Sequence, residues 1–436
     1  MLQEQLREMG VVGAGGAGFP TSVKASSQAE FVLANGAECE PLIHKDAELM
    51  THFSAEIASG MSAMMSATGA PKGIFGVKSK NKHAIEAMRE PLHSASIDLL
   101  EMGDFYPAGD EYELVNLATG RLIPAGGLPI HVGCVVNNVE TLHNVHQAIQ
   151  GKPVTHKFLS VVGAVGRACT FWCPIGTSFR ELLARAGGAT VPEFAIFVSG
   201  LMMGTLTRDL DEVVTKTTAG IIILPSDHYL VTRGSRTEQA QDKIGKSACD
   251  QCSYCTELCP RYLMGYDIQP HKVMRSLVFS STGSEIWNQW AELCCACGLC
   301  TLYACPEDLY PREACLGAKK DMREAGIKYK QEKEVRLHPM KEYRRVPLSQ
   351  LRNRLKIEEF ERESPYEGEP LQTARVEIKL SQHVGTPAEA VVKSGDTVRR
   401  GQTVGRVPEG QLGADIHASI DGRVELVTPE KVIING

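Results

Sequence analysis

The sequence predicts a multidomain α/β protein, and three features of the 436-residue chain carry this prediction. A glycine-rich segment near the N-terminus is followed by short apolar strands and helices, which is typical of an α/β domain. Two groups of closely spaced cysteines lie beyond the middle of the chain. Residues 373–436 contain short strands separated by Gly-Asp and Asp-Gly turns, which indicates a small β domain.

The two cysteine groups have the spacing of iron–sulfur ligands. The first begins at Cys249 and reads Cys-x2-Cys-x2-Cys-x3-Cys-Pro; the second begins at Cys294 and has four residues before its last cysteine. In two-cluster ferredoxins, three closely spaced thiolates hold one cluster, and the cysteine before proline ligates the other. We therefore predict two 4Fe–4S clusters in a ferredoxin-like helical domain over 240–335. The predicted ligands are Cys249, Cys252, Cys255 and Cys305 for one cluster, and Cys294, Cys297, Cys300 and Cys259 for the other.

Other assignments remain open for these cysteines. Cys295 lies beside Cys294 and could replace it as a ligand, and Cys315 on the following predicted helix could also replace a neighbour. A structural zinc site is disfavoured because such sites pair two Cys-x2-Cys units across a spacer. A disulfide framework is disfavoured because residues 1–10 do not resemble a secretory signal, so we expect the thiols to lie in a reducing cytoplasm.

Composition and charge exclude two classes of partner. The net charge is −6, the pI is near 6.1, and the basic residues are dispersed along the chain, so a nucleic acid is not expected as a partner. No apolar run approaches the ~18 to 20 residues that a membrane-spanning helix requires. We therefore expect a soluble protein that is long enough for about three domains.

A glycine-rich loop follows a short amphipathic helix predicted over 1–9. Residues 13–21 read GAGGAGFPT, and crowded glycines let backbone N–H groups approach a phosphate closely. The loop contains GxGxxG, but a Rossmann fingerprint would follow a strand rather than a helix. We therefore predict a phosphate-binding loop of another α/β fold. The helix is predicted to pack on its own domain, with a targeting role toward a partner or shell as the alternative.

Amides and carboxylates are concentrated in three later segments, 35–41, 106–111 and 135–142. The first and third follow or end predicted buried strands, and ligand-facing side chains gather at such strand ends in open α/β sheets. Each segment alone could be an ordinary turn. Together, in this order after a glycine loop and before two cysteine motifs, they predict one binding site.

The segments GAGGAGFPTSVK, NGAECEP and NNVETL resemble the flavin-binding subunit of respiratory complex I and, more closely, the C subunit of the Rnf electron-transport complex. The resemblance implies an FMN/NADH-binding domain over 1–150. Ala37 and Cys39 depart from complex I, which has Asp and Ser at these positions. The implied FMN contacts are Gly13, Gly15, Gly16, Gly18 and Lys24 on the phosphate side, and Asn35, Glu38, Asn137, Asn138 and Thr141 around the ring and ribityl chain; the implied nicotinamide-nucleotide contacts are Phe19, Glu40 and Glu111.

The remaining segments complete the domain plan. Residues 151–235 resemble the β-grasp domain that follows the flavin domain in the same family. Residues 336–372 hold several prolines among many charges and are predicted to be a surface linker. Residues 373–436 resemble a barrel-sandwich hybrid of the biotinyl/lipoyl type. A carrier domain would expose a lysine at its hairpin tip, and the tip at 419–422 has none, so a docking or packing role is predicted.

The order of flavin domain, β-grasp domain, two clusters and C-terminal hybrid resembles the cobalamin reductases of bacterial propanediol-utilisation microcompartments. The resemblance implies electron transfer from NADH through FMN and two 4Fe–4S clusters to cobalamin, reducing cob(III)alamin to cob(II)alamin or cob(I)alamin. It also implies a corrinoid adenosyltransferase and shell or cargo proteins as partners, and an oligomer is possible. We expect the cofactors, and no catalytic acid or base, to carry the chemistry.

Two other functions remain open. The acceptor of electrons from NADH could be a non-corrinoid molecule, as in an Rnf-type protein, because no motif identifies the electron exit. The corrinoid signature DxHxxG is incomplete: Asp415 and His417 begin it, but Ile420 stands where its glycine would be. The third possibility is a non-enzymatic module in which the clusters are structural or sense redox state.

Overall fold

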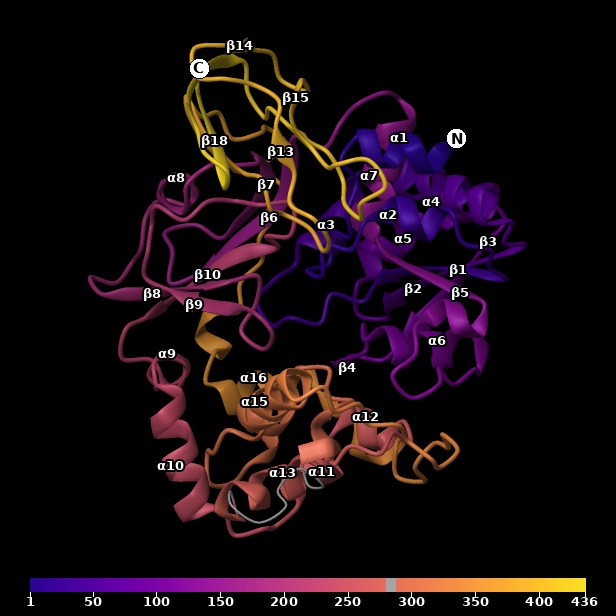
Figure 1. Ribbon diagram of the computed structural model, residues 1–436, viewed down its shortest axis with the longest axis vertical. Coiled ribbons are helices and arrows are strands. Elements are labelled where there is room, and N and C mark those ends of the chain that lie inside the picture. The colour runs from indigo at the N-terminus through magenta and orange to yellow at the C-terminus, as the bar shows by residue number, and fades with distance from the viewer. Residues whose placement is uncertain (280–287) are drawn as a thin grey trace.

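The computed structural model describes residues 1–279 and 288–436, and Figure 1 shows how its parts are arranged. The N-terminal α/β region and the C-terminal β region lie side by side in the upper half of the view. A second sheet lies below the C-terminal β region and to the left of the N-terminal region, and the helices that carry the cysteine motifs form the lower part. No helix in these described residues is both long and apolar enough to cross a membrane.

The N-terminal region is built on a parallel sheet with strand order β3-β2-β1-β5. Neighbouring residues of β1 belong to different cores: Val32 and Ala34 pack on one face and Leu33 on the other, because successive side chains of a strand alternate between faces. The sheet is therefore buried on both sides, as parallel sheets usually are. The strands are β1 (Phe31–Gly36), β2 (Lys72–Lys78), β3 (Ile97–Met102) and β5 (Cys134–Asn138).

Helices cover both faces of this sheet. Two of them begin at side-chain caps, since Asp110 accepts hydrogen bonds from the backbone at the start of α6 and Asn138 does so at the start of α7. Asp110 lies at the end of a turn and Asn138 at the end of β5, so each cap fixes the direction in which its helix starts. The helices are α1 (Leu2–Glu8), α2 (Thr21–Ala25), α3 (Lys45–His52), α4 (Ser54–Thr68), α5 (Lys82–Ser94), α6 (Glu111–Thr119) and α7 (Val139–Ile149).

The second sheet is mixed and has strand order β7-β6-β10-β8-β9. Strands β6 and β10 are parallel, and the other pairs are antiparallel. Helix α8 (Phe179–Arg185) begins with a capping box formed by Ser178 and Glu181. The strands are β6 (His156–Gly163), β7 (Cys169–Pro174), β8 (Phe194–Val198), β9 (Thr205–Thr207) and β10 (Gly220–Pro225).

Short helices surround the cysteine motifs. Their apolar core is small and includes Val273, Met274, Leu309 and Met322, with the buried thiols of Cys305 and Cys315 inside it. Cys300 begins a π-helical turn that ends at Ala304. The helices are α9 (Tyr229–Gly234), α10 (Glu238–Ala248), α11 (Tyr254–Glu257), α12 (Pro260–Leu263), α13 (Pro270–Ser276) and α15 (Pro311–Glu324).

Part of the predicted surface linker, 336–372, belongs to the protein core. Strand β11 (Val346–Pro347) pairs antiparallel with β4 (Phe105–Tyr106) of the N-terminal region. Helix α16 (Leu348–Leu355) follows at once and is buried on one face, where Leu351 and Leu355 are fully buried. Charged residues between these leucines hide the helical period in the sequence, so the linker prediction is wrong for this part. We call residues 341–357 the bracing segment.

The C-terminal region contains two small sheets, β12-β18-β17-β14 and β13-β15-β16. Its own core includes Val376, Ile378, Val404 and Ile434, so it packs as a separate β unit. The strands are β12 (Arg375–Lys379), β13 (Glu389–Ala390), β14 (Thr397–Val398), β15 (Thr403–Arg406), β16 (Ile416–His417), β17 (Gly422–Val427) and β18 (Lys431–Asn435).

This β unit packs against the start of the chain, and Figure 1 shows it beside α1. Arg7 of α1 donates to the carbonyl oxygens of Val407 and Pro408, both at 3.0 Å. The buried Lys216 Nζ donates at 2.7 Å both to Gly10 O and to Asp415 O. The unit therefore contacts α1 directly, and Lys216 links it to Gly10, which precedes the glycine loop.

Candidate functional site

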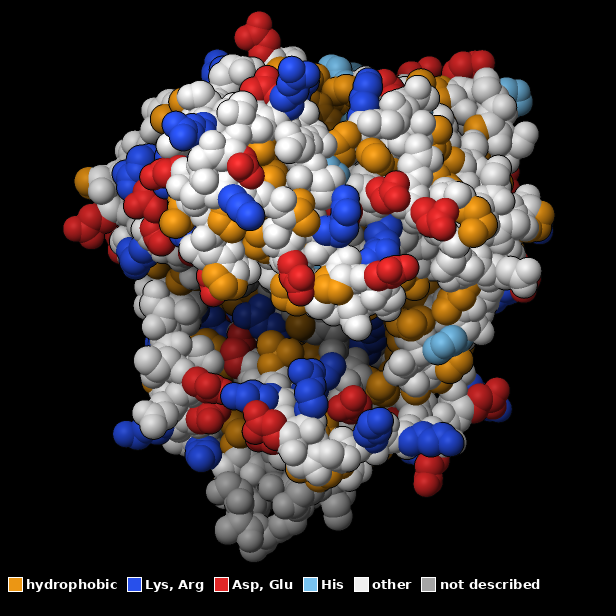
Figure 2. Space-filling model, turned by 45° about the horizontal axis from the view of Figure 1, so that its top comes forward, with side chains coloured by type: hydrophobic (Ala, Val, Ile, Leu, Met, Phe, Trp, Pro, Cys, Tyr) orange, Lys and Arg blue, Asp and Glu red, His pale blue; other side chains and the backbone are white. Residues whose placement is uncertain are grey.

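A cavity of about 580 Å³ opens where β1 and β5 end. Asn35 and Asn138 are paired in register on these two parallel strands, so the segments that follow them leave the sheet at the same edge. The cavity is also lined by the glycine loop, by the turn at 106–111 and by the cysteine-rich region. Figure 2 shows one face of the molecule hollowed between its upper and lower parts, with acidic and basic side chains mixed around the hollow.

Most of the predicted flavin and nucleotide contacts line this cavity. Three do not belong to its lining, namely Gly16, Gly18 and Asn137. Sequence reasoning missed several lining residues because they come from turns, from helix α3 or from the distant cysteine motif. The predicted residues in the lining are Gly13, Gly15, Phe19, Lys24, Asn35, Glu38, Glu40, Glu111, Asn138 and Thr141. The additional ones include Cys39, Lys45, Asp46, Tyr106, Leu128, Met203, Cys295 and Cys297.

Gly18 faces the C-terminal β unit instead of the cavity. Its φ is +64°, and a Cβ built on it would lie 3.1 Å from Thr217 Cγ2 and 3.3 Å from His383 Cα. Its carbonyl oxygen accepts a hydrogen bond from Val384 N at 3.0 Å. Glycine is therefore needed here for the left-handed conformation and for the close approach of the β unit.

Asn137 is buried beside the lining residues Val136 and Asn138. Neither its amide nitrogen nor its amide oxygen has a hydrogen-bond partner among the described residues. Buried polar groups without a partner are uncommon in native proteins. This side chain is therefore an unsatisfied donor and acceptor close to the cavity.

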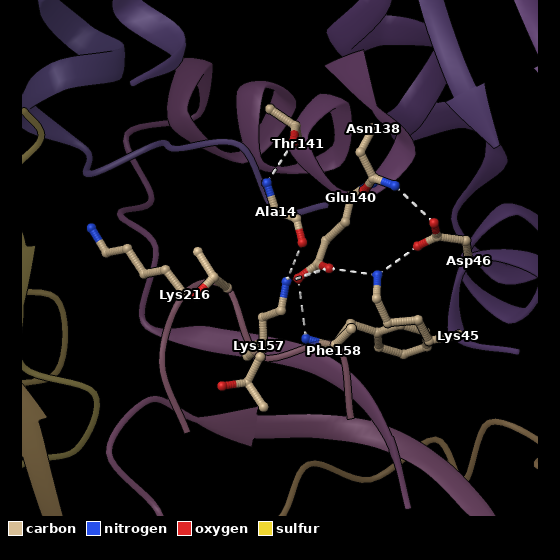
Figure 3. A network of polar contacts seen from close by, with 12 residues as sticks. Ala14, Lys45, Asp46, Asn138, Glu140, Thr141, Lys157, Phe158 and Lys216 are labelled. Carbon is tan, nitrogen blue, oxygen red and sulfur yellow. Dashed lines mark hydrogen bonds and ion pairs between the residues drawn. The ribbon is translucent and has the colours of Figure 1, made fainter. Parts of the chain in front are cut away.

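A buried ionic network fixes the glycine loop, as Figure 3 shows. The carboxylate of Glu140 on α7 is fully buried and accepts from Lys45 Nζ at 2.9 Å and from Lys157 Nζ at 2.7 Å. Lys157, on β6 of the second sheet, also donates to Ala14 O at 3.1 Å, and Ala14 N donates to Thr141 Oγ1 at 2.9 Å. The backbone N–H of Ala14 is thus bonded to α7, and its backbone carbonyl is bonded to the neighbouring sheet.

Burial alone would raise the pKa of Glu140, but the two lysines hold it below its usual value. Burial lowers the pKa of Lys157 to about 8, against the attraction of Glu140. Near neutral pH the carboxylate is therefore ionised between two ammonium groups. A buried charge of this kind is tolerated only when it is paired and hydrogen-bonded.

Glu38 ties the end of β1 to the start of α3. Its carboxylate accepts from Asp46 N at 2.9 Å and Ala47 N at 3.3 Å, and the side chain of Asn138 donates to Asp46 Oδ2 at 2.7 Å. Burial, together with Asp46, raises the pKa of Glu38 to about 8. Its φ of 37° is unusual for a residue other than glycine. Strained conformations of this kind cluster at functional sites.

Glu40 connects the cavity to the second sheet and to the cysteine region. Its two carboxylate oxygens accept from the backbone N–H groups of Met202 and Met203, each at 2.9 Å. Met202 O in turn accepts from Arg312 Nη1 of α15 at 2.6 Å. Burial raises the pKa of Glu40 to about 7. Glu40, which is predicted to contact the nucleotide, therefore also links the cavity to the second-sheet region and, through Met202, to α15.

The cavity fits a flavin nucleotide on three observations. Its volume lies within the range of about 300 to 1,000 Å³ that is usual for sites of small molecules and cofactors. A loop with several glycines lines one end, where backbone N–H groups suit a phosphate. Lys24 contributes a mostly buried ammonium, whose Nζ lies 3.9 Å from Glu111 and donates to Val136 O.

The structure gathers the cysteines into two sets that match the crossed pattern. In the first set, the thiols of Cys249, Cys252 and Cys305 are near enough to raise the pKa of Cys255, which burial already raises; together these effects bring it to about 12. In the second set, burial raises the pKa of Cys300, and Cys294 and Cys259 raise it further; Cys255 of the first set also acts on Cys300, so the two sets are close to each other. Cysteines far apart in the sequence are therefore neighbours.

Two further thiols belong to the second set. Cys315 lies near enough to Cys294, and Cys295 near enough to Cys297, for the two thiols of each pair to shift each other's pKa. The second set thus contains more thiols than the four that one cluster requires, and which four of them are ligands stays open. No three His, Cys, Asp or Glu side chains within the described ranges converge on a single metal ion. A 4Fe–4S cluster makes a different demand, because each of its four cysteines binds a different iron.

The second set lies beside the cavity, whereas no cysteine of the first set belongs to the cavity lining. Cys295 and Cys297 form part of the cavity lining, and the hydroxyl of Tyr106 donates to Cys297 O at 2.6 Å. Half-buried thiols occur in both sets, Cys249 and Cys252 in the first and Cys294 and Cys295 in the second. Contact with the cavity lining therefore identifies the second set as the one nearer to the cavity.

The bracing segment, 341–357, holds the cavity and the cysteine sets together. Its strand β11 pairs with β4, which carries Tyr106. Farther along it, Arg354 donates to Cys305 O at 3.1 Å, and Gln350 accepts from the hydroxyl of Tyr303 at 3.0 Å. One continuous segment therefore contacts both the cavity wall and the second cysteine motif.

Comparisons with known proteins agree with this arrangement. Three family models match the chain: the Nuo51 FMN-binding domain over residues 6–147, a 4Fe-4S dicluster domain over 248–310, and the RnfC barrel sandwich hybrid domain over 359–435. The chain therefore carries an FMN-binding domain and a 4Fe–4S dicluster domain, which confirms the predicted fold class and cofactors.

Relatives and solved structures extend the likeness. The cobalamin reductase PduS of Salmonella typhimurium is 40% identical over 99% of this chain and 96% of its own length, and that of Citrobacter freundii gives the same values. The C subunit of the proton-translocating ferredoxin:NAD(+) oxidoreductase complex of Clostridium ljungdahlii is 31% identical over 59% of this chain and 55% of its own. A crystal structure of an NAD+-reducing [NiFe]-hydrogenase shares the fold, with a TM-score of 0.51 and 21% identity, over 77% of this chain and 63% of that chain.

A flavin cavity beside two cysteine sets defines a class: the chain is a flavin- and iron–sulfur-dependent oxidoreductase that transfers electrons. Within this class of oxidoreductases, two PduS proteins are 40% identical to this chain over 99% of its length, which identifies the family. The chain belongs to the PduS family of cobalamin reductases.

Replacing Gly15 by valine is expected to abolish FMN binding and leave both clusters in place. A Cβ at this position would lie only 3.2 Å from Asn138 Cβ, and valine adds two further methyl groups toward the cavity. Flavin released by acid and total iron, both measured per chain, report the two cofactors separately. The matched control is Gly317→Ala in α15, where a Cβ meets nothing within 4 Å. Normal flavin content in Gly15→Val would show that the loop does not bind the flavin.

Proposed function

We propose that this chain is an NADH-dependent cobalamin reductase that reduces cob(III)alamin to cob(II)alamin and cob(I)alamin. The observation that carries the proposal is the 40% identity to PduS cobalamin reductases over 99% of the chain, together with a flavin-sized cavity beside a cysteine set. Bound FMN would supply the conversion of a two-electron hydride into single electrons, which 4Fe–4S clusters carry one at a time.

The residues of this chain have separate tasks in that reaction. The glycine loop, through Gly13 and Gly15, would bind the FMN phosphate with backbone N–H groups. Phe19 and Met203 offer apolar walls to the flavin and nicotinamide rings. The ionic network around Glu140 keeps the loop in its binding conformation. No residue is required as a catalytic acid or base.

The placement of the cysteine sets favours one direction of electron flow. The set containing Cys259, Cys294, Cys297 and Cys300 adjoins the cavity, and no thiol of the set containing Cys249, Cys252, Cys255 and Cys305 belongs to the cavity lining. Electrons are therefore proposed to leave near Cys252, where the exposed Tyr254 lies close to the thiol in the sequence. An acceptor could be reduced there at the surface, without a corrinoid-binding motif.

The proposal extends to partners and location. By analogy with the PduS relatives, we propose that the protein works inside a bacterial microcompartment, supplies reduced corrinoid to an adenosyltransferase, and contacts shell or cargo proteins. The likeness to an Rnf-type C subunit, at 31% identity over 59% of the chain, supports a second candidate, an NADH-driven reductase of a non-corrinoid acceptor.

Anaerobically purified protein with NADH and hydroxocobalamin is expected to form cob(II)alamin, followed by absorbance, faster than an equal concentration of free FMN with NADH does. Ferredoxin and a quinone, tested in parallel, define the acceptor. If hydroxocobalamin is reduced no faster than by free flavin while ferredoxin or the quinone is reduced quickly, the second candidate is correct. If NADH bleaches neither flavin nor clusters, both candidates fail.

A further inference from the structure

Arg261 is a buried cation at the boundary between the cavity and the second cysteine set. It lies two residues after Cys259 on α12, and its side chain is only 11% exposed. The guanidinium carbon lies 3.5 Å from the centroid of the Tyr112 ring and 6.0 Å from that of Tyr266. Stacking on these rings fixes the plane of the guanidinium group.

The guanidinium interacts with both sides of this boundary. On the cavity side, Nη2 donates to Asp110 Oδ2 at 2.9 Å, and Asp110 lines the cavity and caps α6. On the cysteine side, the guanidinium lies near enough to the thiol of Cys295 to act on it electrostatically, and Cys295 lines the cavity together with Cys297. Arg261 thus contacts the cavity wall and lies close to the thiols at once.

One nitrogen of this group remains unused. Nη1 of Arg261 is buried and has no hydrogen-bond partner in the part of the chain that the structure describes. A buried donor without a partner is energetically costly, and more so when it is charged. An acceptor at this place would therefore be favourable, and the sulfur atoms of a cluster held by the neighbouring cysteines are suitable acceptors.

A positive charge and an N–H donor beside a cluster have a known electrostatic consequence. The potential of an iron–sulfur cluster depends on nearby charge, on hydrogen bonds to its sulfur atoms and on exposure to solvent. Adding an electron makes the cluster more negative, so a fixed cation stabilises the reduced state. The effect is larger at a buried site, because the effective dielectric constant there is lower.

We propose that Arg261 is a positioning residue that raises the reduction potential of the cluster held by Cys259, Cys294, Cys297 and Cys300. Two other cations near this set differ from Arg261: Lys319, which donates to Cys294 O at 3.1 Å, is only half-buried, and Arg312 is paired with the carboxylate of its neighbour Glu313. Asp110 partly balances the charge of Arg261, so the ion pair sets the size of the effect. The proposal rests on the proposed function only in requiring that both clusters are present.

The test is a redox titration of the full chain, purified anaerobically and followed by electron paramagnetic resonance without corrinoid. In Arg261→Gln, the equilibrium constant for reducing the second-set cluster is expected to fall about tenfold, which corresponds to about 59 mV for one electron. Arg261→Lys retains the charge but not the fork of donors, so a smaller decrease is expected. Repeating the titration in a Cys252→Ala background, where the first-set cluster is removed, assigns the signal.

Two further variants keep the test decisive if Arg261→Gln folds poorly. Asp110→Asn should shift the same cluster in the opposite direction, because it removes the balancing carboxylate while asparagine still caps α6. Arg354→Gln is the matched control: its side chain donates to Cys305 O at 3.1 Å, so it should affect only the first-set cluster. Equal shifts of both clusters in Arg261→Gln, or no shift in either Arg261→Gln or Asp110→Asn, would overturn the proposal even if cobalamin reduction is confirmed.

Discussion

Cys252→Ala is expected to lose one cluster and keep the flavin. Cys252 is half-buried, at the exposed side of the first set, and its neighbours there are Cys249, Cys255 and Cys305. Removing one of four thiolates should prevent stable assembly of that cluster. The FMN cavity is lined by other parts of the chain. Iron should therefore fall from about eight to about four atoms per chain with flavin unchanged.

The same variant also tests the route of electrons. NADH should still bleach the flavin and the remaining cluster, while reduction of hydroxocobalamin should drop to the rate of free reduced flavin. Cys169→Ala, a buried thiol of the second sheet, is the control and should keep both clusters. Cys295→Ala and Cys315→Ala then decide whether either extra thiol is a ligand. Loss of flavin together with iron in Cys252→Ala would contradict separate cofactor sites.

Glu140→Gln is expected to lower the free energy of unfolding by about 3 to 5 kcal/mol, the usual cost of removing one partner from a buried ion pair. The glutamine leaves Lys157 with Ala14 O as its other acceptor, while Lys45 retains Asp46. Urea titrations of the wild type and the variant, with cofactor content measured in parallel, give the difference. Because the network holds Ala14, weaker flavin binding should accompany the loss of stability.

The effect of Glu140→Gln should also depend on pH with a defined sign. The pKa of Glu140 is lowered in the folded protein, so its stabilising contribution is complete above the unfolded-state value of about 4.3 and is lost as the pH falls through the folded-state value. The difference between the two proteins should therefore be full at neutral pH and shrink in acid.

An exposed carboxylate provides the matched control for this experiment. Glu86→Gln removes a carboxylate that pairs with Arg89 at the surface, where the Glu86 side chain is 81% exposed. Its effect should stay within about 0.5 kcal/mol. If Glu140→Gln changes stability no more than Glu86→Gln does, the buried network is not a stabilising element of the fold.

The sequence predicted the parts of the site that are encoded by local patterns. The cysteine spacing led to the two sets, and the order of glycine loop and strand ends led to most of the cavity lining, because each motif combines chemistry with local geometry. The structure adds that Cys295 and Cys297 adjoin the cavity. This contact brings the cysteine motif beside the glycine loop and the strand ends, which are far from it in the sequence, so the spacing of residues within a motif cannot predict it.

Other features depended on tertiary contacts and could not be read from the chain. Lys157 looks like an ordinary strand residue, and only the fold shows that it binds both Glu140 and Ala14. Gly18 was grouped with the phosphate loop, but its neighbours are Thr217 and the C-terminal β unit. The leucines of α16 were hidden among charges, so a buried helix was interpreted as part of a linker.

The bracing segment has a consequence for protein engineering. A chimaera that exchanged residues 240–335 alone between relatives would keep both cysteine motifs but would replace the partners of Arg354 and Gln350. In such a chimaera β11 would still pair with β4 of the recipient protein. The helix that follows β11, α16, would instead pack against the cysteine region of the donor protein. A transplant that preserves the spacing between the redox centres should therefore include residues up to 357, so the exchangeable cassette is longer than the motif that identifies it.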